Sequence, residues 1–136
     1  MRLIARIAIP LAALLLLVAC GGQGTLGKKA LSQEAKGIQS LAAEGSLLAG
    51  DAARGRSTTV FTRVHARFLR DAARKSAATL EHGGTSKAQR LGRVADRVGN
   101  DLERLSRSGS DRELQRLLEH DLALASAAAK RLDKSL

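Results

Sequence analysis

The side chains in this chain that are best suited to binding or chemistry are arginines, and eight of them form two rows at helical spacing. At 100° per residue, the members of each row fall on one face of a helix. Arginine's planar guanidinium matches the oxygen atoms of phosphate and carboxylate groups. The rows therefore predict an anion-binding surface, and the alternative is a charged face that contacts solvent. The first row is Arg63, Arg67, Arg70 and Arg74, and the second is Arg90, Arg93, Arg97 and Arg104.

The charge of the chain is concentrated where these rows lie. The 136 residues include 23 basic and 13 acidic side chains, and residues 54–107 hold 13 of the basic and 5 of the acidic ones. Such an excess attracts anionic lipid, an anionic polymer or an acidic protein. Nucleic acid fits the charge, but single-strand binders stack bases on aromatic rings. With two Phe and no Tyr or Trp, we expect no nucleic-acid partner.

Residues that carry catalysis or bind metals are few. The chain has one Cys and three His, and it lacks the Glu-x-x-His, His-Glu-x-x-His and Gly-x-Ser-x-Gly motifs. His65 is expected to be a partly buried, hydrogen-bonded core histidine near the edge of an apolar stripe, and His82 a cap or cation at a helix end. We therefore predict a protein that is not an enzyme, with no catalytic residues, no metal site and no dissociable cofactor.

The N-terminal residues have the pattern of an export signal. Arg2 and Arg6 precede an uncharged apolar run over residues 7–18, which is short of the roughly 20 residues that span a bilayer. A short apolar run behind positive charges is typical of a signal peptide. The run ends in Leu17-Val18-Ala19-Cys20, followed by Gly21 and Gly22.

This ending resembles the lipobox of bacterial lipoprotein precursors. The resemblance implies that residues 1–19 are cleaved and that Cys20 carries a diacylglyceryl group and acyl chains such as palmitate. Two or three chains would hold the protein stably at a membrane. The implied location is the cell envelope, on the extracytoplasmic side: the outer face of the plasma membrane or, since Gly21 rather than Asp follows the Cys, the outer membrane of a two-membrane bacterium. The alternative is an uncleaved signal anchor.

The elements that must position the arginines are four helices behind a Gly-rich tether at residues 20–27. Residues 28–136 contain no Pro and are rich in Ala, Leu and Arg, which favour helices. We expect helices from about 28 to 53, from Ser57-Thr58-Thr59 to Gly83-Gly84, from Thr85-Ser86 to Gly109, and from Ser110 onward. Ser110 and Glu113 match a capping box. Short loops favour antiparallel neighbours, so the predicted fold is an all-α, up-and-down four-helix bundle over residues 28–136.

Each predicted helix has an apolar stripe that should face the core. The stripes are Leu31, Ile38, Leu41, Ala42, Gly45, Leu48 and Ala52 in the first helix; Val60, Phe61, Val64, Phe68, Ala72 and Leu80 in the second; Ala88, Leu91, Ala95, Val98, Leu102 and Leu105 in the third; and Leu114, Leu118, Leu122, Ala125, Ala129 and Leu132 in the fourth. The first arginine row is expected on the side of the second helix opposite its stripe.

The core is thin, because Leu, Ile, Val and Phe together make up 24 of the 117 residues after the signal. Two classes of function follow. The first is a non-catalytic lipoprotein whose arginine-rich hairpin binds an anionic envelope surface or an acidic partner. The second is an assembly lipoprotein that completes its core by self-association or against a helical partner. A further alternative is a small-ligand or metal carrier that uses His65.

Overall fold

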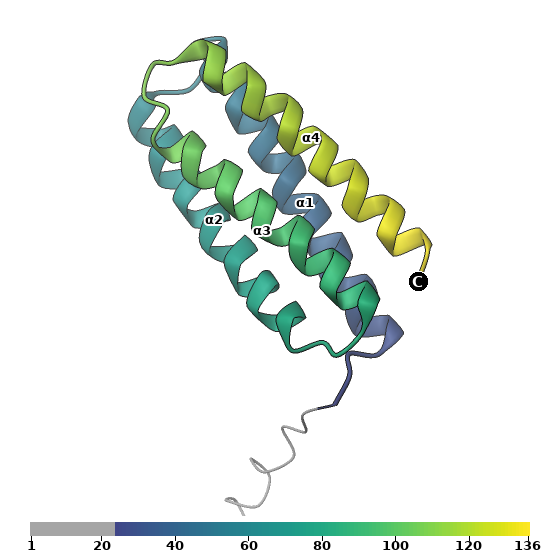
Figure 1. Cartoon of the computed structure of the whole chain (residues 1–136). Coiled ribbons are helices and arrows are strands. Elements are labelled where there is room, and N and C mark those ends of the chain that lie inside the picture. The colour runs from purple at the N-terminus through teal and green to yellow at the C-terminus, as the bar shows by residue number, and fades with distance from the viewer. Residues whose placement is uncertain (1–23) are drawn as a thin grey trace, which may run out of the picture.

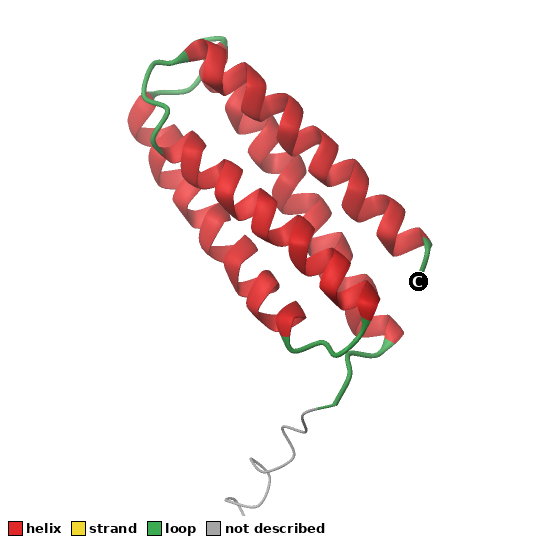
Figure 2. Ribbon diagram, in the orientation of Figure 1, coloured by secondary structure: helices red, strands yellow, loops and turns green. Residues whose placement is uncertain are grey.

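The computed structural model describes residues 24–136, so the predicted signal peptide and Cys20 lie outside the described residues. The described chain forms four helices in an up-and-down bundle (Figure 1). Figure 2 shows helices joined by short loops and no strand in this part of the chain. The predicted all-α four-helix bundle is confirmed. The helices are α1 (Lys28–Ala53), α2 (Thr59–Glu81), α3 (Ser86–Ser106) and α4 (Arg112–Lys134).

Local side-chain chemistry sets the helix starts. Thr58 caps α2 by accepting a hydrogen bond from the Phe61 amide, and Thr85 caps α3 by accepting one from the Ala88 amide. The predicted capping box at Ser110 is wrong, since α4 is capped by Asp111, whose carboxylate accepts from the amide of Leu114. An Asp at this position also interacts favourably with the positive end of the helix dipole.

The helices pack most closely as two pairs, α1 with α4 and α2 with α3, and the pairs join across α3–α4, α1–α2 and α1–α3 (Figure 1). The stripe predicted for the third helix is fully buried, and those of the first and fourth helices are buried except for partly covered members such as Leu41, Leu114 and Leu132. The buried core contains residues from all four helices, of which Leu31 is the first in the sequence and Ala129 the last. Residues 24–136 thus share one connected apolar core.

The stripe predicted for the second helix is mostly wrong. Leu80 is buried, but four large apolar residues of that stripe are 57–68% exposed: Val60, Phe61, Val64 and Phe68. The buried face of α2 consists instead of Thr62, Ala66, Leu69, Ala73 and Leu80. Its small residues let α2 approach α3 closely, where Gly99 lies against Ala73 and Gly92 against Leu80. Bulkier Phe and Val side chains would hold the two helices apart.

The tether reaches the bundle at the end where α1 begins and α4 finishes (Figure 1). The Leu26 amide donates a 3.1 Å hydrogen bond to the Gly83 carbonyl oxygen, which fixes the incoming chain against the α2–α3 turn. We call this end of the bundle, which contains the start of α1, the α2–α3 turn and the end of α4, the tether end. Within residues 24–136, no helix has the length and apolar character needed to cross a membrane.

Candidate anion-binding site

The second arginine row lies along a groove between α3 and α4. Three of its members, Arg90, Arg93 and Arg97, line the groove together with Arg131 of α4. Among residues 24–136, none of these four guanidinium groups has a carboxylate oxygen within 4.0 Å. The groove has a volume of about 530 Å³, and its remaining lining is Val94, Ala128, Leu132 and Ser135. We call it the arginine groove.

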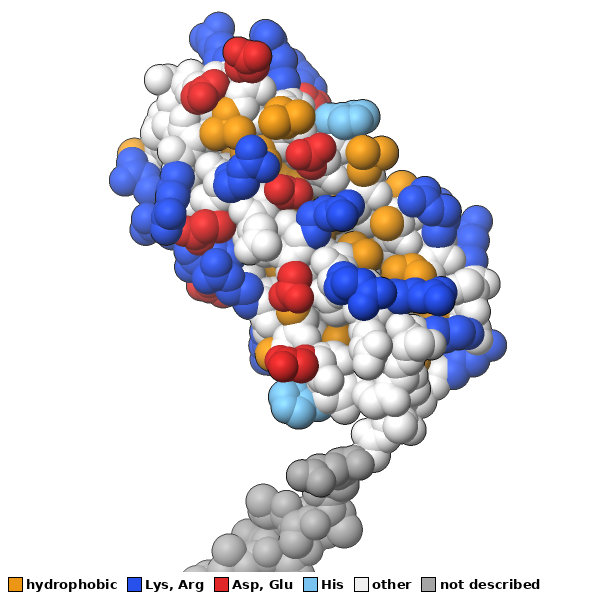
Figure 3. Space-filling model, viewed as in Figure 1, with side chains coloured by type: hydrophobic (Ala, Val, Ile, Leu, Met, Phe, Trp, Pro, Cys, Tyr) orange, Lys and Arg blue, Asp and Glu red, His pale blue; other side chains and the backbone are white. Residues whose placement is uncertain are grey.

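The arginine groove combines a cationic rim with a largely apolar floor. Each guanidinium presents paired N–H donors that fit two oxygens of a phosphate or carboxylate group. The volume lies within the range of roughly 300–1,000 Å³ that is usual for ligand sites. Figure 3 shows basic side chains gathered over α3 and α4 toward the tether end of the bundle. The arrangement suits an anion that carries an apolar part.

The first arginine row is partly neutralised. Arg70 donates hydrogen bonds to both Asp71 and Glu103, and the bond to Glu103 is the main reason why its pKa is raised. Arg74 lies 3.8 Å from Glu103, and Arg107 adds a 2.6 Å contact to the same residue. The bond from Arg70 likewise holds the pKa of Glu103 below its ordinary value. Arg70 and Arg74 of α2 therefore join α2 to α3 through Glu103, whereas the contact of Arg107 with Glu103 is local.

The two rows do not share one surface. Arg70 and Arg74 face α3 at Glu103, whereas Arg90, Arg93 and Arg97 of the second row line the arginine groove next to α4. The two remaining members of the first row, Arg63 and Arg67, are exposed near the opposite end of the bundle, without a carboxylate partner in the described chain. The structure thus gathers Arg90, Arg93 and Arg97, and leaves the first row apart from them.

Buried acid lies beyond the far end of the arginine groove. The Nη1 atom of Arg104 is 3.5 Å from Oδ1 of Asp101, whose side chain is 9% exposed. Burial raises the pKa of Asp101, and nearby Asp121 adds to this, while Arg104 and Arg97 oppose it. Arg97 borders a small hollow with both carboxylates. The field for anions is therefore strongest at the other end, around Arg90, Arg93 and Arg131.

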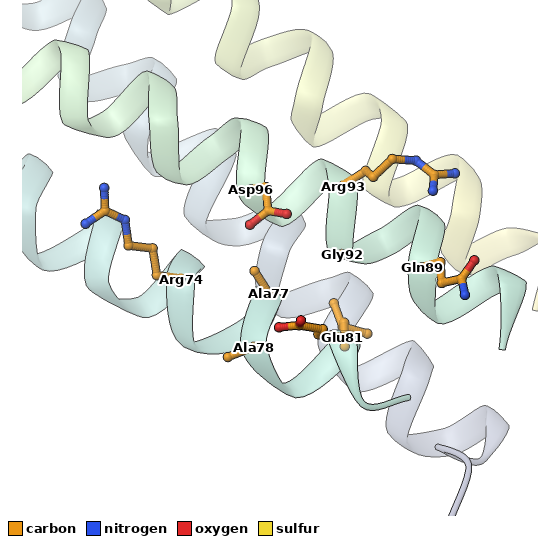
Figure 4. A pocket seen from close by; sticks show the side chains of 9 residues that line it. Arg74, Ala77, Ala78, Glu81, Gln89, Gly92, Arg93 and Asp96 are labelled. Atoms are coloured by element: carbon orange, nitrogen blue, oxygen red, sulfur yellow. The ribbon is translucent and has the colours of Figure 1, made fainter. Parts of the chain in front are cut away.

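A second groove, between α2 and α3, carries mixed charge. Its volume is about 540 Å³, and Figure 4 shows carboxylates of Glu81 and Asp96 among its lining side chains. Arg74 and Arg93 also border it, but in Figure 4 the Arg93 side chain extends away from α2 toward α4. The acidic groups make this groove less suited to an anion than the arginine groove.

The histidines have structural surroundings. The His65 ring stacks against Phe61 and Phe68, and its Nε2 atom lies 2.7 Å from Oε1 of Glu44. His65 is therefore hydrogen-bonded and, at 31% side-chain exposure, partly buried as expected, but it packs against the exposed Phe rings and not within the core. Nδ1 of His82 lies 3.0 Å from the Ala78 carbonyl oxygen at the end of α2. In the described part of the chain, no three His, Cys, Asp or Glu residues come together as metal ligands would.

Arg131 is the site residue that sequence reasoning missed. It stands outside both rows, so no periodicity singled it out. The turn at Gly109 supplies the missing signal, because α3 and α4 run antiparallel on either side of it and residues about equally distant from the turn lie level. This rule brings Arg90 level with the part of α4 around Arg131.

Searches against protein-family models, curated proteins and solved structures found no match for the chain.

Proposed function

We propose that this protein is a lipid-anchored envelope lipoprotein without catalytic activity, which binds the phosphate groups of anionic phospholipids through the arginine groove. One observation carries the proposal. Four arginines without a carboxylate partner in the described chain line an open groove close to the tether end. The anchor itself rests on the resemblance of Leu17-Val18-Ala19-Cys20 to a lipobox.

The geometry of the tether favours the lipids of the anchoring membrane as the ligand. Since Leu26 is hydrogen-bonded to the bundle, about six residues would separate the proposed lipid on Cys20 from the bundle, and a Gly-rich chain of that length has a typical reach of roughly 13 Å. The bundle is longer, because the 23 residues of α2 extend about 35 Å at 1.5 Å per residue. The tether end therefore stays near the headgroups. Arg90 lies about one turn from the start of α3, within reach of them.

The apolar floor of the arginine groove supports the same choice. A free inorganic anion needs cations alone, whereas a phospholipid headgroup brings the glycerol backbone and the start of its acyl chains. Val94, Ala128 and Leu132 offer these parts an apolar surface between the arginines. Each basic side chain near an anionic membrane contributes about 1 kcal/mol of binding free energy.

Vesicle binding tests the proposal. The chain from Gly21 onward is mixed with vesicles of phosphatidylcholine alone or of phosphatidylcholine and phosphatidylglycerol in equal parts. Binding is expected to the anionic vesicles and to weaken as salt rises. A variant with Arg90→Gln, Arg93→Gln and Arg131→Gln should bind roughly 100-fold more weakly, since three contacts of about 1 kcal/mol are lost.

The matched control removes the same charge from the other end of the bundle. It carries Arg56→Gln, Arg112→Gln and Arg116→Gln, three exposed arginines outside the groove and outside α2. This control should retain most of the binding. An equal loss in both variants would show that net charge rather than the groove attracts the membrane. Absence of binding to anionic vesicles, with binding to a soluble polyglycerol phosphate, would replace lipid by polymer as the ligand.

A further inference from the structure

Large apolar side chains cover the outer face of the first half of α2. Val60, Phe61, Val64 and Phe68 are 57–68% exposed, and we call them the apolar strip. The strip is ordered, because the His65 ring stacks between the two Phe rings at centroid distances of 5.4 and 6.2 Å. Glu44 of α1 holds that ring through a 2.7 Å hydrogen bond. A rigid aromatic surface of this kind is prepared for contact.

The size of the apolar strip is sufficient for a protein contact. Together with Leu47, which is 72% exposed and one turn from Glu44 on α1, it exposes on the order of 500 Å² of apolar surface, with about 200 Å² for a whole Phe. This is at the upper end of what a soluble monomer usually exposes. Two such surfaces face to face bury on the order of 1,000 Å², close to the lower limit of a specific interface.

Opposite charges flank the strip. At 100° per residue, Arg67 and Arg63 lie on one side of Val60 and Val64, and His65 with its partner Glu44 lies on the other side, beyond Phe61. The Glu44 side chain is 52% exposed. Along the helix, His65 is level with the interval between Arg63 and Arg67. A basic and an acidic flank therefore lie at the same height on the two sides of one apolar surface.

We propose that the apolar strip is the interface of a homodimer, in which α2 packs in parallel against α2 of a second copy. A two-fold axis along the bundle brings the basic flank of each copy against the acidic flank of the other, so that Arg67 faces the partner's Glu44. A perpendicular axis would instead oppose arginine to arginine. The charge pattern selects the parallel arrangement.

The parallel arrangement also places both tether ends on the same side. Two copies anchored in one membrane, as the proposed function has it, have this orientation when they meet. The arginine groove lies between α3 and α4, outside the proposed contact of α2 with α2. The contact itself needs no lipid, so dimerisation and vesicle binding can be tested independently.

The first test is the mass in solution of the chain from Gly21 onward, measured by sedimentation equilibrium over a range of concentrations. The wild type should reach twice the monomer mass. Phe68→Ser removes one ring from each side and should raise the dissociation constant more than roughly 100-fold. Leu124→Ser is the matched control, since Leu124 is a similarly exposed residue on α4, and it should leave the dimer intact. Circular dichroism checks that each variant keeps its helix content.

The second test is a charge exchange. Glu44→Arg alone places like charges together twice in the dimer, and so does Arg67→Glu alone, so each variant should be monomeric. Their mixture restores two opposite-charge pairs and should form a heterodimer. Monomeric mixtures alongside a dimeric wild type would overturn the parallel geometry. A wild type that stays monomeric at all concentrations would overturn the proposal, and its insertion into neutral phosphatidylcholine vesicles would assign the apolar strip to the bilayer instead.

Discussion

Replacement of Asp101 by Asn is expected to stabilise the folded protein at neutral pH. Asp101 is buried, and its Oδ2 atom has no hydrogen-bond partner among the described residues. Its other oxygen makes one long contact of 3.5 Å with Arg104. Burial, reinforced by Asp121, raises the pKa of Asp101 despite the attraction of Arg104 and Arg97. The ionised carboxylate therefore lowers the stability of the fold.

The magnitude follows from the missing partner. A buried polar group without a hydrogen bond costs about 1–3 kcal/mol and more when it is charged; Asn leaves the same position unpaired but removes the buried charge and its repulsion by Asp121, and the partly exposed Arg104 contact that is lost is worth at most about 1 kcal/mol. We expect Asp101→Asn to raise the free energy of unfolding by about 1 kcal/mol at pH 7. Since the folded pKa is raised, the stability from protonated Asp101 is complete below its ordinary pKa near 4 and is lost as pH rises through the folded pKa. The advantage of Asn should therefore vanish near pH 3.

Urea unfolding followed by circular dichroism at pH 7 and pH 3 measures both values. Asp96→Asn serves as the control, because Asp96 is an exposed carboxylate on the same helix and its change should be within about 0.5 kcal/mol of zero. If Asp101→Asn proves less stable than the wild type at pH 7, the attraction of Arg104 and Arg97 outweighs the effect of burial, and the reasoning is refuted.

Two further predictions concern packing and ion pairs. A Cβ atom at Gly45 would lie 2.8 Å from the buried Leu102 side chain, whereas nothing lies within 4 Å of a Cβ atom at Gly37. Gly37→Ala should therefore stabilise α1 by about 0.5–1 kcal/mol, and Gly45→Ala should destabilise the fold by about 1 kcal/mol. Chemical denaturation measures both changes. Glu103→Gln should lower the thermal midpoint at pH 7, because Glu103 bonds Arg70. Because the pKa of Glu103 is lowered in the folded protein, this stabilisation is present above the ordinary pKa of Glu and is lost as pH falls through the folded pKa. Equal thermal midpoints for the variant and the wild type at pH 7 would contradict the stabilising role of Glu103.

The fold could be predicted from the sequence because local signals agree with one another. In α3, the spacing of Ala88, Leu91 and Ala95 defines a single stripe of apolar residues, and most other positions are charged, polar or glycine, so only one face can be buried. Thr58 and Thr85 mark the helix starts, since each precedes an apolar periodic segment and offers a hydroxyl to a free amide. At the start of α4, Ser110 and Asp111 are adjacent residues that cap helices about equally well, so the sequence left two possible starts, and the structure uses Asp111.

The buried face of α2 could not be predicted because this helix has two apolar stripes. Size favoured the stripe with Phe61 and Phe68, but the structure buries the one with Ala66, Leu69 and Ala73. The decision is tertiary: Gly92 and Gly99 of α3 admit close approach, which small side chains can use. For the same reason, the sequence could not predict whether the two arginine rows lie on the same surface, since this depends on the rotation of α2 about its axis.

The pairing of α1 with α4 has a consequence for how the chain becomes folded. Ser32 near the start donates a hydrogen bond to Asp133 near the end, so the first helix completes its packing with the last one made. The α2–α3 hairpin involves neighbours in sequence and can form early, since a short loop costs little entropy to close. During synthesis, much of the apolar face of α1 therefore stays uncovered until α4 emerges, because α1 packs less extensively against α2 and α3 than against α4. Truncation of a few C-terminal residues should therefore expose the beginning of the chain to proteases rather than its middle.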